Sequence, residues 1–193
     1  EIVLVGNGVD SEARHLADTY IALEGNIGVA AGWNLAVLRA TRPFLCFLND
    51  DAVFVDGETP RRLLAAARGG AIAGPYSNHA KPPQGDIARE RTPAGDQIVP
   101  AIVGVCLAVS REIFDRVGGF EARLLTWDDD DFCRRAAGHG AASLVVGGTW
   151  VAHHRHASFR ALGLDLDAIA RRAERRFAQT HAPIHAAAIA CDE

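Results

Sequence analysis

The run from Phe44 to Leu48 constrains the fold most, because it is wholly apolar and stops abruptly at Asn49-Asp50-Asp51. A short, continuous apolar run of this kind is typical of a central strand that is covered on both faces of a sheet. Similar runs recur along the chain, separated by segments whose apolar residues fall at helical spacing. Strands that alternate with helices predict an α/β sandwich with a mostly parallel central sheet.

Capping and turn residues divide the chain into individual elements. Thr59-Pro60 combines an N-cap residue with proline at the first helical position, Ser110 is a second N-cap, and Gly118-Gly119 ends the helix that follows it. We expect strands at 2–5, 44–48, 71–73, 99–109, 142–146 and 149–152, helices at 28–40, 61–68, 111–117, 131–137 and 164–180, and a long mobile loop at 77–98.

Length and composition indicate one compact globular domain. The chain has 193 residues, of which 49% are hydrophobic and 23% charged. We expect the domain to span residues 1–160, with residues 161–193 forming a C-terminal helical extension packed on it. The formal net charge of −4 gives no general attraction to nucleic acid, so we expect no nucleic-acid partner. An anionic ligand must then be held locally, by a metal ion or by backbone amides.

Cysteine content and hydropathy indicate a cytoplasmic protein. The four cysteines lie far apart and form no CxxC pair, which predicts a reducing compartment without disulfides. No apolar run approaches the ~18 residues of a membrane helix, and no signal peptide is visible. The chain opens in a strand-like segment and contains no Met, so we expect a fragment that lacks the strand before it.

Polar clusters follow three of the expected strands. They are Gly6-Asn7-Gly8, Asn49-Asp50-Asp51 and His153-His154-Arg155-His156. In open α/β sheets, ligands bind beyond the carboxyl ends of the strands. The sequence therefore predicts a binding site at this edge of the sheet.

Asn49-Asp50-Asp51 places carboxylates at the end of an apolar strand. Mg²⁺ and Mn²⁺ prefer oxygen ligands and often bind one or two carboxylates together with substrate phosphates. Such an ion would neutralise a diphosphate leaving group. The alternative is an Asx turn at a strand end, and the residues alone do not decide between the two.

The run from Asp128 to Asp131 follows Trp127 and precedes a helix. Adjacent carboxylates repel one another, which raises the pKa of at least one, as a general base requires. The alternative is that Asp residues favour the start of a helix through capping and the helix dipole. Without further context, capping explains the run better.

Three weaker signals have equally good alternatives. With one acidic ligand, a histidine of the 153–156 cluster would complete a metal site, but a surface cluster is the other interpretation. The segment 25–28 would present backbone amides to a phosphate, or form a simple turn. The basic helix carrying Arg171, Arg172, Arg175 and Arg176 is a solvated face, or a surface for a membrane or an anionic partner. Pro183 separates His181 from His185, which argues against a ligand pair there.

Taken in order, these segments resemble the inverting, GT-A-like glycosyltransferases of family 2, especially the rhamnosyltransferase-like branch. The likeness covers residues 1 to about 160. The segments that carry it are 2–9 (strand and turn), 26–34 (Asn-x-Gly-x-Ala-x-x-x-Asn), 48–51 (Leu-Asn-x-Asp), 104–120 (ending in Val-Gly-Gly-Phe), 128–135 (acidic run, apolar residue, Cys, Arg) and 151–158 (Val-x-His with a following Ser). Each is short, but their order and spacing are specific.

The resemblance implies a GT-A-like three-layer α/β/α sandwich, a nucleotide-diphosphate sugar donor, assistance by Mg²⁺ or Mn²⁺, and inversion by direct displacement. It implies a glycan, lipid-linked or small-molecule acceptor and a location in the cytoplasm or at the inner face of the membrane. The roles it assigns by position are base for Asp129, metal contact for Asp51 and His153, nucleotide and donor binding for Asn7, Asn26, Gly28, Asn34, Asn49 and Asp50, and the acceptor or donor pocket for Gly104, Trp127 and Asp128.

The chain departs from the family pattern at several positions. Gly6 stands where the family has Asp, Val9 where it has Ser, and Asp128 where it has Glu. The first two departures remove expected nucleotide contacts, and the run of four acids leaves the register of the base open. A binding domain without turnover and a nucleotidyltransferase are therefore alternatives. The second is disfavoured, because no Gly-rich strand-to-helix loop with a phosphate-binding Lys is present.

Overall fold

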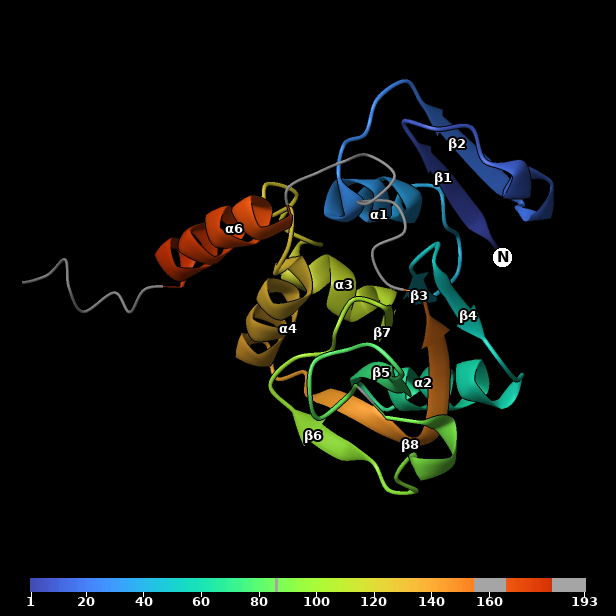
Figure 1. The fold of residues 1–193 in the computed structure, drawn as a ribbon, viewed down its shortest axis with the longest axis vertical. Coiled ribbons are helices and arrows are strands. Elements are labelled where there is room, and N and C mark those ends of the chain that lie inside the picture. Colours follow the sequence, from blue (N-terminus) through green and yellow to red (C-terminus); the bar gives the residue numbers. More distant parts are fainter. Residues whose placement is uncertain (86, 155–165, 182–193) are drawn as a thin grey trace, which may run out of the picture.

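A computed structural model describes residues 1–85, 87–154 and 166–181 of the chain (Figure 1). Strands and helices alternate over much of this range. In chain order the elements are β1 (Val3–Asn7), the 3-10 helix η1 (Glu12–Leu16), β2 (Thr19–Leu23), α1 (Val29–Val37), β3 (Phe44–Leu48), β4 (Ala52–Phe54), α2 (Glu58–Arg68), β5 (Ile72–Ser77), the 3-10 helix η2 (Arg89–Arg91), β6 (Gln97–Val99), β7 (Cys106–Ser110), α3 (Arg111–Val117), α4 (Asp128–Gly138), β8 (Ser143–His153) and α6 (Leu166–Thr180).

The strands form two sheets. A six-stranded sheet has the order β3-β7-β5-β8-β4, with β6 also paired to β8, and a smaller sheet contains β1 and β2. The β1–β2 and β5–β8 pairs are parallel, whereas the other pairs are antiparallel. The α/β fold class is confirmed, but the expectation of a mostly parallel central sheet is wrong for the larger sheet. Its strands pair with partners distant in sequence, which no local pattern reveals.

Strand β3 has the predicted bounds but not the predicted place. It lies at the end of the six-stranded order, and Cys46 in its middle is exposed. Leu45 and Phe47 point the other way and are buried. The run was expected to be a central strand covered on both faces, and that expectation is wrong, because uninterrupted hydrophobicity does not report which neighbours a strand has.

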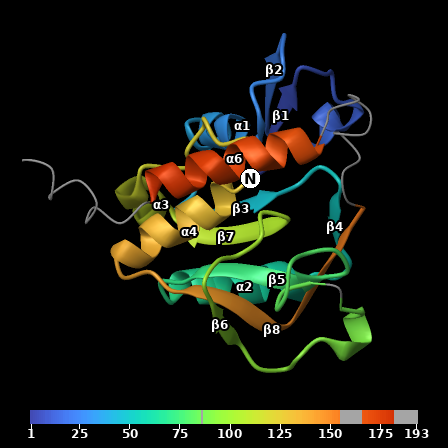
Figure 2. The ribbon, with the colours of Figure 1, turned by 60° about the vertical axis from the view of Figure 1, so that its left-hand side comes forward.

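Helices cover both faces of the larger sheet, which gives three layers (Figures 1 and 2). Alternate residues of β7 show the two interfaces. Leu107 and Val109 belong to the core shared with α1, α3 and α4, whereas Cys106 and Ala108 belong to the core shared with α2. Side chains alternate across a strand, so a strand buried throughout must be covered on both sides. The three-layer arrangement is confirmed.

Local signals located most element ends. The Ser110 hydroxyl accepts a hydrogen bond from the Ile113 amide at 3.2 Å, and Gly118 ends α3 with φ 84°. Thr59, in contrast, lies inside α2, whose first amides are capped by Asp56. The expected strand at 99–109 is divided between β6 and β7, the two expected strands at 142–152 form the single strand β8, and α4 begins at Asp128 rather than at 131.

The C-terminal helix α6 contacts the start of α4. The ring centroids of Phe177 and Trp127 are 5.3 Å apart, and Ala173 is buried. The expected domain boundary at residue 160 lies outside the described residues, as do Arg155, His156, Ser158, His185 and Cys191. Within the described ranges, no helix is long and apolar enough to cross a membrane.

Candidate active site

The acidic run occupies the first turn of α4, and Asp129 is fixed there by two backbone amides. Its Oδ2 accepts a hydrogen bond from the Gly104 amide at 2.7 Å, and its Oδ1 accepts one from the Asp130 amide at 2.9 Å. A Cβ on Gly104 would lie 3.3 Å from the Trp33 ring and 3.4 Å from Asp129 Oδ2. A side chain at position 104 would therefore be in tight contact with the Trp33 ring and with this carboxylate.

The other members of the run differ sharply in their partners. Asp131 is 1% exposed, and its Oδ2 accepts two hydrogen bonds from the Arg135 guanidinium. Asp130 forms an ion pair with Lys81 at 3.4 Å. These two carboxylates are occupied by cationic side chains of the protein, so Asp128 and Asp129 are the candidates for proton transfer.

Both remaining carboxyl groups have raised pKa values. Burial, followed by the charge of Asp129, raises the pKa of Asp128 to about 7. Burial and the charge of Asp130 raise the pKa of Asp129, while the amide hydrogen bonds from Gly104 and Asp130 oppose that rise. A carboxyl group with a pKa near neutrality is well matched to general-base work. The raised pKa values of Asp128 and Asp129 are therefore a property of the run that helix capping alone does not explain.

Asp51, which follows β3, meets His153, the last residue of β8. Asp51 Oδ1 lies 3.2 Å from His153 Nε2, and both side chains are about nine-tenths buried. His153 Nδ1 lies 2.9 Å from the carbonyl oxygen of His79, which only accepts, so Nδ1 carries a proton. Nε2 then faces the carboxylate either as a protonated donor or as a metal ligand. Fixing one ring nitrogen in this way is how metal-binding histidines are oriented.

Two backbone segments join this pair to the acidic helix. The Asn49 amide donates to the Val105 carbonyl at 3.1 Å, next to Gly104, which contacts Asp129. The loop after β5 also reaches both: Asn78 exchanges hydrogen bonds with the His153 backbone, and Lys81 contacts Asp130. The two acidic clusters therefore belong to one site, at the edge of the sheet where β3, β5 and β8 end.

The loop from Asn78 to Lys81 was missed by the sequence interpretation. It was assigned to a long irregular loop, which also contains η2 and leads into β6. It follows an apolar strand in the same way as the three polar clusters that were recognised, and that position was the available signal. His154, which had been grouped with His153, is exposed, and its amide donates to the Asp51 carbonyl oxygen at 2.8 Å.

Asn7, Asn26 and Gly28 form a second polar group, at the start of α1. Asn7 Nδ2 donates to the Gly28 carbonyl and Asn7 Oδ1 accepts from the Ile27 amide, while Asn26 Oδ1 accepts from the Gly28 amide. Leu125, shortly before Trp127, comes within 3.5 Å of where a Cβ on Gly28 would lie. The start of α1 therefore lies close to the segment that carries the acidic run.

Asn34 is differently engaged. Its Nδ2 donates to the Phe120 carbonyl at 2.8 Å, and its Oδ1 accepts from the Phe120 amide at 3.0 Å. Both ends of the side-chain amide are thus used to hold α1 against the segment after α3. Both polar atoms of Asn34 are therefore engaged within the protein, and its expected nucleotide contact stays a prediction.

The departure at Gly6 has a structural counterpart in Tyr20. A Cβ on Gly6 would lie 2.2 Å from the Tyr20 hydroxyl oxygen and 2.6 Å from the Val9 carbonyl oxygen, so a larger residue would require these atoms to move. That hydroxyl donates to Asp10 Oδ1 at 3.0 Å and accepts from the Ser11 amide. Tyr20 and Asp10 line an open cleft of about 350 Å³ at the carboxyl ends of β1 and β2. This network places a carboxylate beside the cleft although position 6 lacks one.

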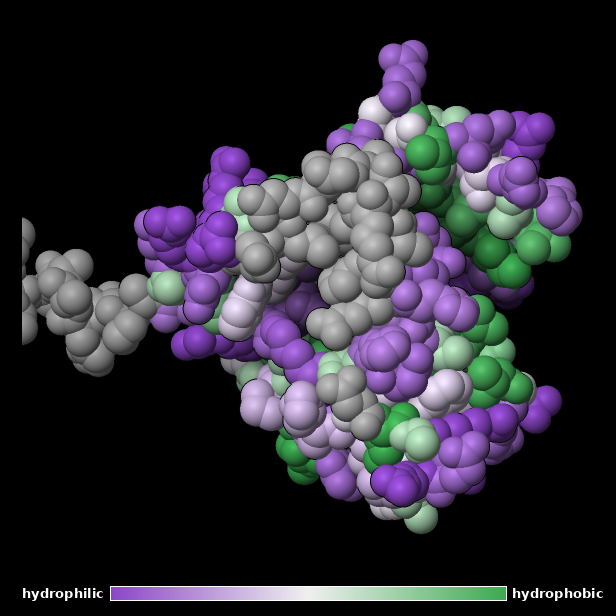
Figure 3. Space-filling view, in the orientation of Figure 1, coloured by the Kyte–Doolittle hydropathy of each residue, from purple (hydrophilic) through white to green (hydrophobic). Residues whose placement is uncertain are grey.

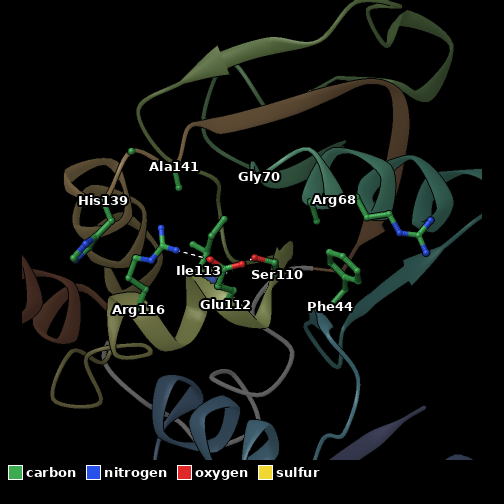
Figure 4. Close-up of a pocket in the computed structure, with 11 residues that line it drawn as sticks. Phe44, Arg68, Gly70, Ser110, Glu112, Ile113, Arg116, His139 and Ala141 are labelled. Atoms are coloured by element: carbon green, nitrogen blue, oxygen red, sulfur yellow. Dashed lines mark hydrogen bonds and ion pairs between the residues drawn. The ribbon is translucent and has the colours of Figure 1, made fainter.

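A second cavity, of about 320 Å³, lies at the opposite end of the larger sheet, where β3 begins and β7 ends (Figure 4). Arg116 there is paired with Glu112, and the Arg68 guanidinium lies 5.5 Å from the centre of the Phe44 ring. The cavity is separated from the acidic clusters by the length of the strands. We assign it no part in the candidate site.

Comparison with known proteins identifies the fold. No family model matches the sequence, and no curated protein matches it. Among solved structures, GalNAc-T7 with UDP, GalNAc and Mn²⁺ aligns with a TM-score of 0.64, 15% identity, and coverage of 79% of this chain and 37% of that one. The mannosyltransferase PcManGT from Pyrobaculum calidifontis with GDP-Man and Mn²⁺ aligns with a TM-score of 0.59 and 20% identity. The alignment covers 79% of this chain and 47% of that one. S. aureus TarS 1-349 aligns with a TM-score of 0.58 and 16% identity, and the alignment covers 84% of this chain and 53% of that one.

These matches define the class of the fold, which is that of the GT-A glycosyltransferases. The chain spans between 37% and 53% of the length of these three solved structures. At these identities the likeness shows the fold alone.

Proposed function

We propose that this protein is a metal-assisted, inverting glycosyltransferase that moves a sugar from a nucleotide-diphosphate donor to an acceptor hydroxyl. The observation that carries the proposal is that a candidate metal-binding pair and a candidate base are connected in one site. The Asp51–His153 pair and the Asp129 carboxylate are joined through Gly104-Val105 and through the Asn78–Lys81 loop. The Asp51–His153 pair suits a leaving diphosphate, and the Asp129 carboxylate suits a nucleophilic hydroxyl.

The residues present fit a divalent cation bound together with its substrate. Asp51 and His153 would supply an oxygen and a nitrogen ligand, and Mg²⁺ or Mn²⁺ commonly takes its remaining ligands from substrate phosphates and water. Among the described residues, no group of three or more His, Cys, Asp and Glu side chains is placed to hold a metal alone. When bound, such a cation stabilises the negative charge that develops on the leaving diphosphate.

Asp129 performs the proton transfer in this proposal. Its amide hydrogen bonds hold the carboxylate in one orientation, and its raised pKa favours capture of the acceptor proton. The acceptor oxygen then forms a bond to the anomeric carbon while the bond from that carbon to the phosphate oxygen breaks. Attack from the face opposite the leaving group inverts the anomeric configuration. Asp128, in the adjacent register, is the alternative base.

The remaining polar residues are assigned to the donor and acceptor. We place the nucleoside along the cleft between Asp10 and Tyr20 and the start of α1, where Asn7, Asn26 and Gly28 lie. Asn49 and Asp50 adjoin the ribose and phosphates, and Gly104, Trp127 and Asp128 line the sugar and acceptor pocket. A glycan, a lipid-linked sugar or a small molecule with a free hydroxyl is the acceptor class.

The proposal is tested by thermal melting with UDP, GDP, ADP and dTDP in the presence of Mn²⁺, followed by a donor screen that detects released diphosphate. Binding to the native state raises the melting temperature, by the equivalent of about 2.7 kcal/mol at 100 times the Kd. The resemblance to rhamnosyltransferases makes a dTDP-linked deoxyhexose the first donor to test. No melting shift with any of the four nucleotides contradicts the proposal, and a shift without turnover identifies a binding domain.

The role of Asp129 has its own test. Asp129→Asn keeps the side-chain size and removes the base, so we expect transfer to the acceptor to be lost while nucleotide binding persists. Donor hydrolysis does not require a base for the acceptor, so the acceptor product must be measured separately. Transfer that survives in Asp129→Asn but not in Asp128→Asn assigns the base to the neighbouring residue.

We also propose peripheral association with an anionic membrane surface through α6. Arg171, Arg172 and Arg175 are exposed on this helix, and hydrophilic side chains gather over it (Figure 3). Each basic residue near an anionic bilayer contributes about 1 kcal/mol. Sedimentation with phosphatidylserine vesicles, but not with phosphatidylcholine vesicles, is expected, and charge reversal of the three arginines should abolish it. Equal binding to both vesicle types contradicts the association.

A further inference from the structure

Helix α6 contacts the turn that presents the acidic run. Phe177 packs on Trp127 with ring centroids 5.3 Å apart, and the rings of Phe177 and His181 are 4.6 Å apart. His181 Nε2 lies 2.8 Å from Asp131 Oδ1 and, since a carboxylate accepts, donates to it. The end of α6 therefore reaches the residues on either side of Asp128 and Asp129.

Asp131 has its two oxygens divided between different elements. Arg135 donates twice to Oδ2, and the same guanidinium donates to the carbonyl oxygens of Val117 and Gly119 at the end of α3. His181, at the end of α6, donates to Oδ1. A carboxylate that is 1% exposed needs both sets of partners, because an unpaired buried charge is strongly destabilising.

Trp127 is the residue whose conformation most needs such support. It is the only non-glycine with a positive φ among the described residues, at 70°, and it immediately precedes Asp128. A left-handed non-glycine residue costs of order 1–3 kcal/mol and persists where its surroundings enforce it. Lys81 lies 4.3 Å from the centre of the Trp127 ring, so the ring is contacted by α6 and by the loop after β5.

We infer that Phe177 and His181 are positioning residues: together they hold the Trp127 turn and the first turn of α4 so that the base faces the acceptor. This inference rests on the proposed function. Neither residue touches the reacting atoms; they act through Trp127 and Asp131. Helix α6 is thus a functional part of the active site.

The test compares His181→Ala, Phe177→Ala and His181→Gln with the control Gln179→Ala, an exposed position on the same helix. We expect the two Ala variants at positions 177 and 181 to lower kcat roughly 10- to 100-fold, as displacement of a catalytic group does. Nucleotide binding with Mn²⁺, measured by melting, should stay within about twofold of wild type. His181→Gln should recover most of kcat, because its side-chain amide also donates to Asp131, and Gln179→Ala should match wild type.

A second readout follows the turn itself. The three tryptophans give three indole N–H resonances in a ¹H–¹⁵N spectrum, and Trp127→Phe identifies that of Trp127. We expect this resonance to move in Phe177→Ala and His181→Ala and to stay in Gln179→Ala. An unmoved resonance, or an unchanged kcat, overturns the inference. Failure of wild type to transfer any sugar contradicts the proposed function, and the indole spectra then decide separately whether α6 holds the turn.

Discussion

Asp129 accepts a hydrogen bond from the amide of Gly104 at 2.7 Å, across 25 positions of the sequence. This bond joins the first turn of α4 to the segment that enters β7, and Asn49 is attached to the same segment through Val105. The proposed base and the proposed metal-binding pair, which come from separate parts of the chain, are thereby attached to one backbone support. Substitutions along this support should therefore affect turnover.

Gly104→Ala should impair turnover more than stability. The added methyl group would press on Trp33 and on the Asp129 carboxylate, at 3.3 and 3.4 Å. We expect kcat to fall roughly 10-fold or more, with a loss of about 1 kcal/mol in the free energy of unfolding from overpacking. Steady-state kinetics and urea unfolding measure the two effects. Gly57→Ala is the matched control, since a Cβ there meets nothing within 4 Å; equal kinetics for both variants would contradict the prediction.

Asp51→Asn and His153→Ala should each remove the dependence of nucleotide binding on Mn²⁺. The two side chains face each other at 3.2 Å, and each is proposed to supply one metal ligand. We expect the gain in melting temperature on adding Mn²⁺ with a nucleoside diphosphate to disappear in both variants. His154→Ala keeps the backbone hydrogen bond to Asp51 and should behave as wild type. A retained Mn²⁺ response in His153→Ala would remove His153 from the metal site.

Asp128 should make the protein less stable as the pH rises. Burial and the charge of Asp129 raise its folded-state pKa from 3.8 to about 7, so the folded state holds a proton that the unfolded state has released. Its contribution to stability is full below about pH 4 and is lost as the pH rises through about 7. Urea midpoints between about pH 4 and about pH 8 should therefore fall more steeply in wild type than in Asp128→Asn. Parallel curves for the two proteins would show that Asp128 titrates normally.

Asn34→Ala should destabilise the fold without weakening nucleotide binding. It leaves the amide and carbonyl of the buried residue Phe120 without partners, at a cost of about 1–3 kcal/mol. Asn26 is exposed and belongs to the proposed donor site, so Asn26→Ala should give the opposite pattern. Chemical unfolding and nucleotide-dependent melting separate the two outcomes. Weaker binding in Asn34→Ala at unchanged stability would restore Asn34 to the donor site.

Local sequence signals predicted most elements and several of their ends. The apolar run at Phe44 to Leu48 gave the bounds of β3, and Ser110 and Gly118 delimit α3 as expected. These signals depend on hydrogen bonds and side-chain spacing within a few residues, which is why a sequence reveals them. The direction of the strands was predicted poorly, because pairing with β7 and β8 joins residues that are far apart in the chain.

The acidic clusters were recognised from the sequence, but their division of labour was not. Four adjacent Asp residues are chemically identical, and only their neighbours in the fold distinguish them. Arg135 and His181 engage Asp131, Lys81 pairs with Asp130, and Gly104 fixes Asp129. The partner of Asp131 at the end of α6 was not anticipated, because no local pattern points to that contact. The loop from Asn78 to Lys81 was missed, although its position after an apolar strand was a signal.

The sequence by itself determined which residue types stand where strands end, and hence that carboxylates and a histidine would be offered at one edge of an α/β sheet. The tertiary structure alone decided which of them meet. Asp51 faces His153 because β4 pairs with β8 and aligns Ala52 with His153. Asn34 is bonded to the backbone of Phe120 because the segment after α3 folds back onto α1. Local propensity is set by neighbours in the chain, whereas these contacts depend on packing between distant segments.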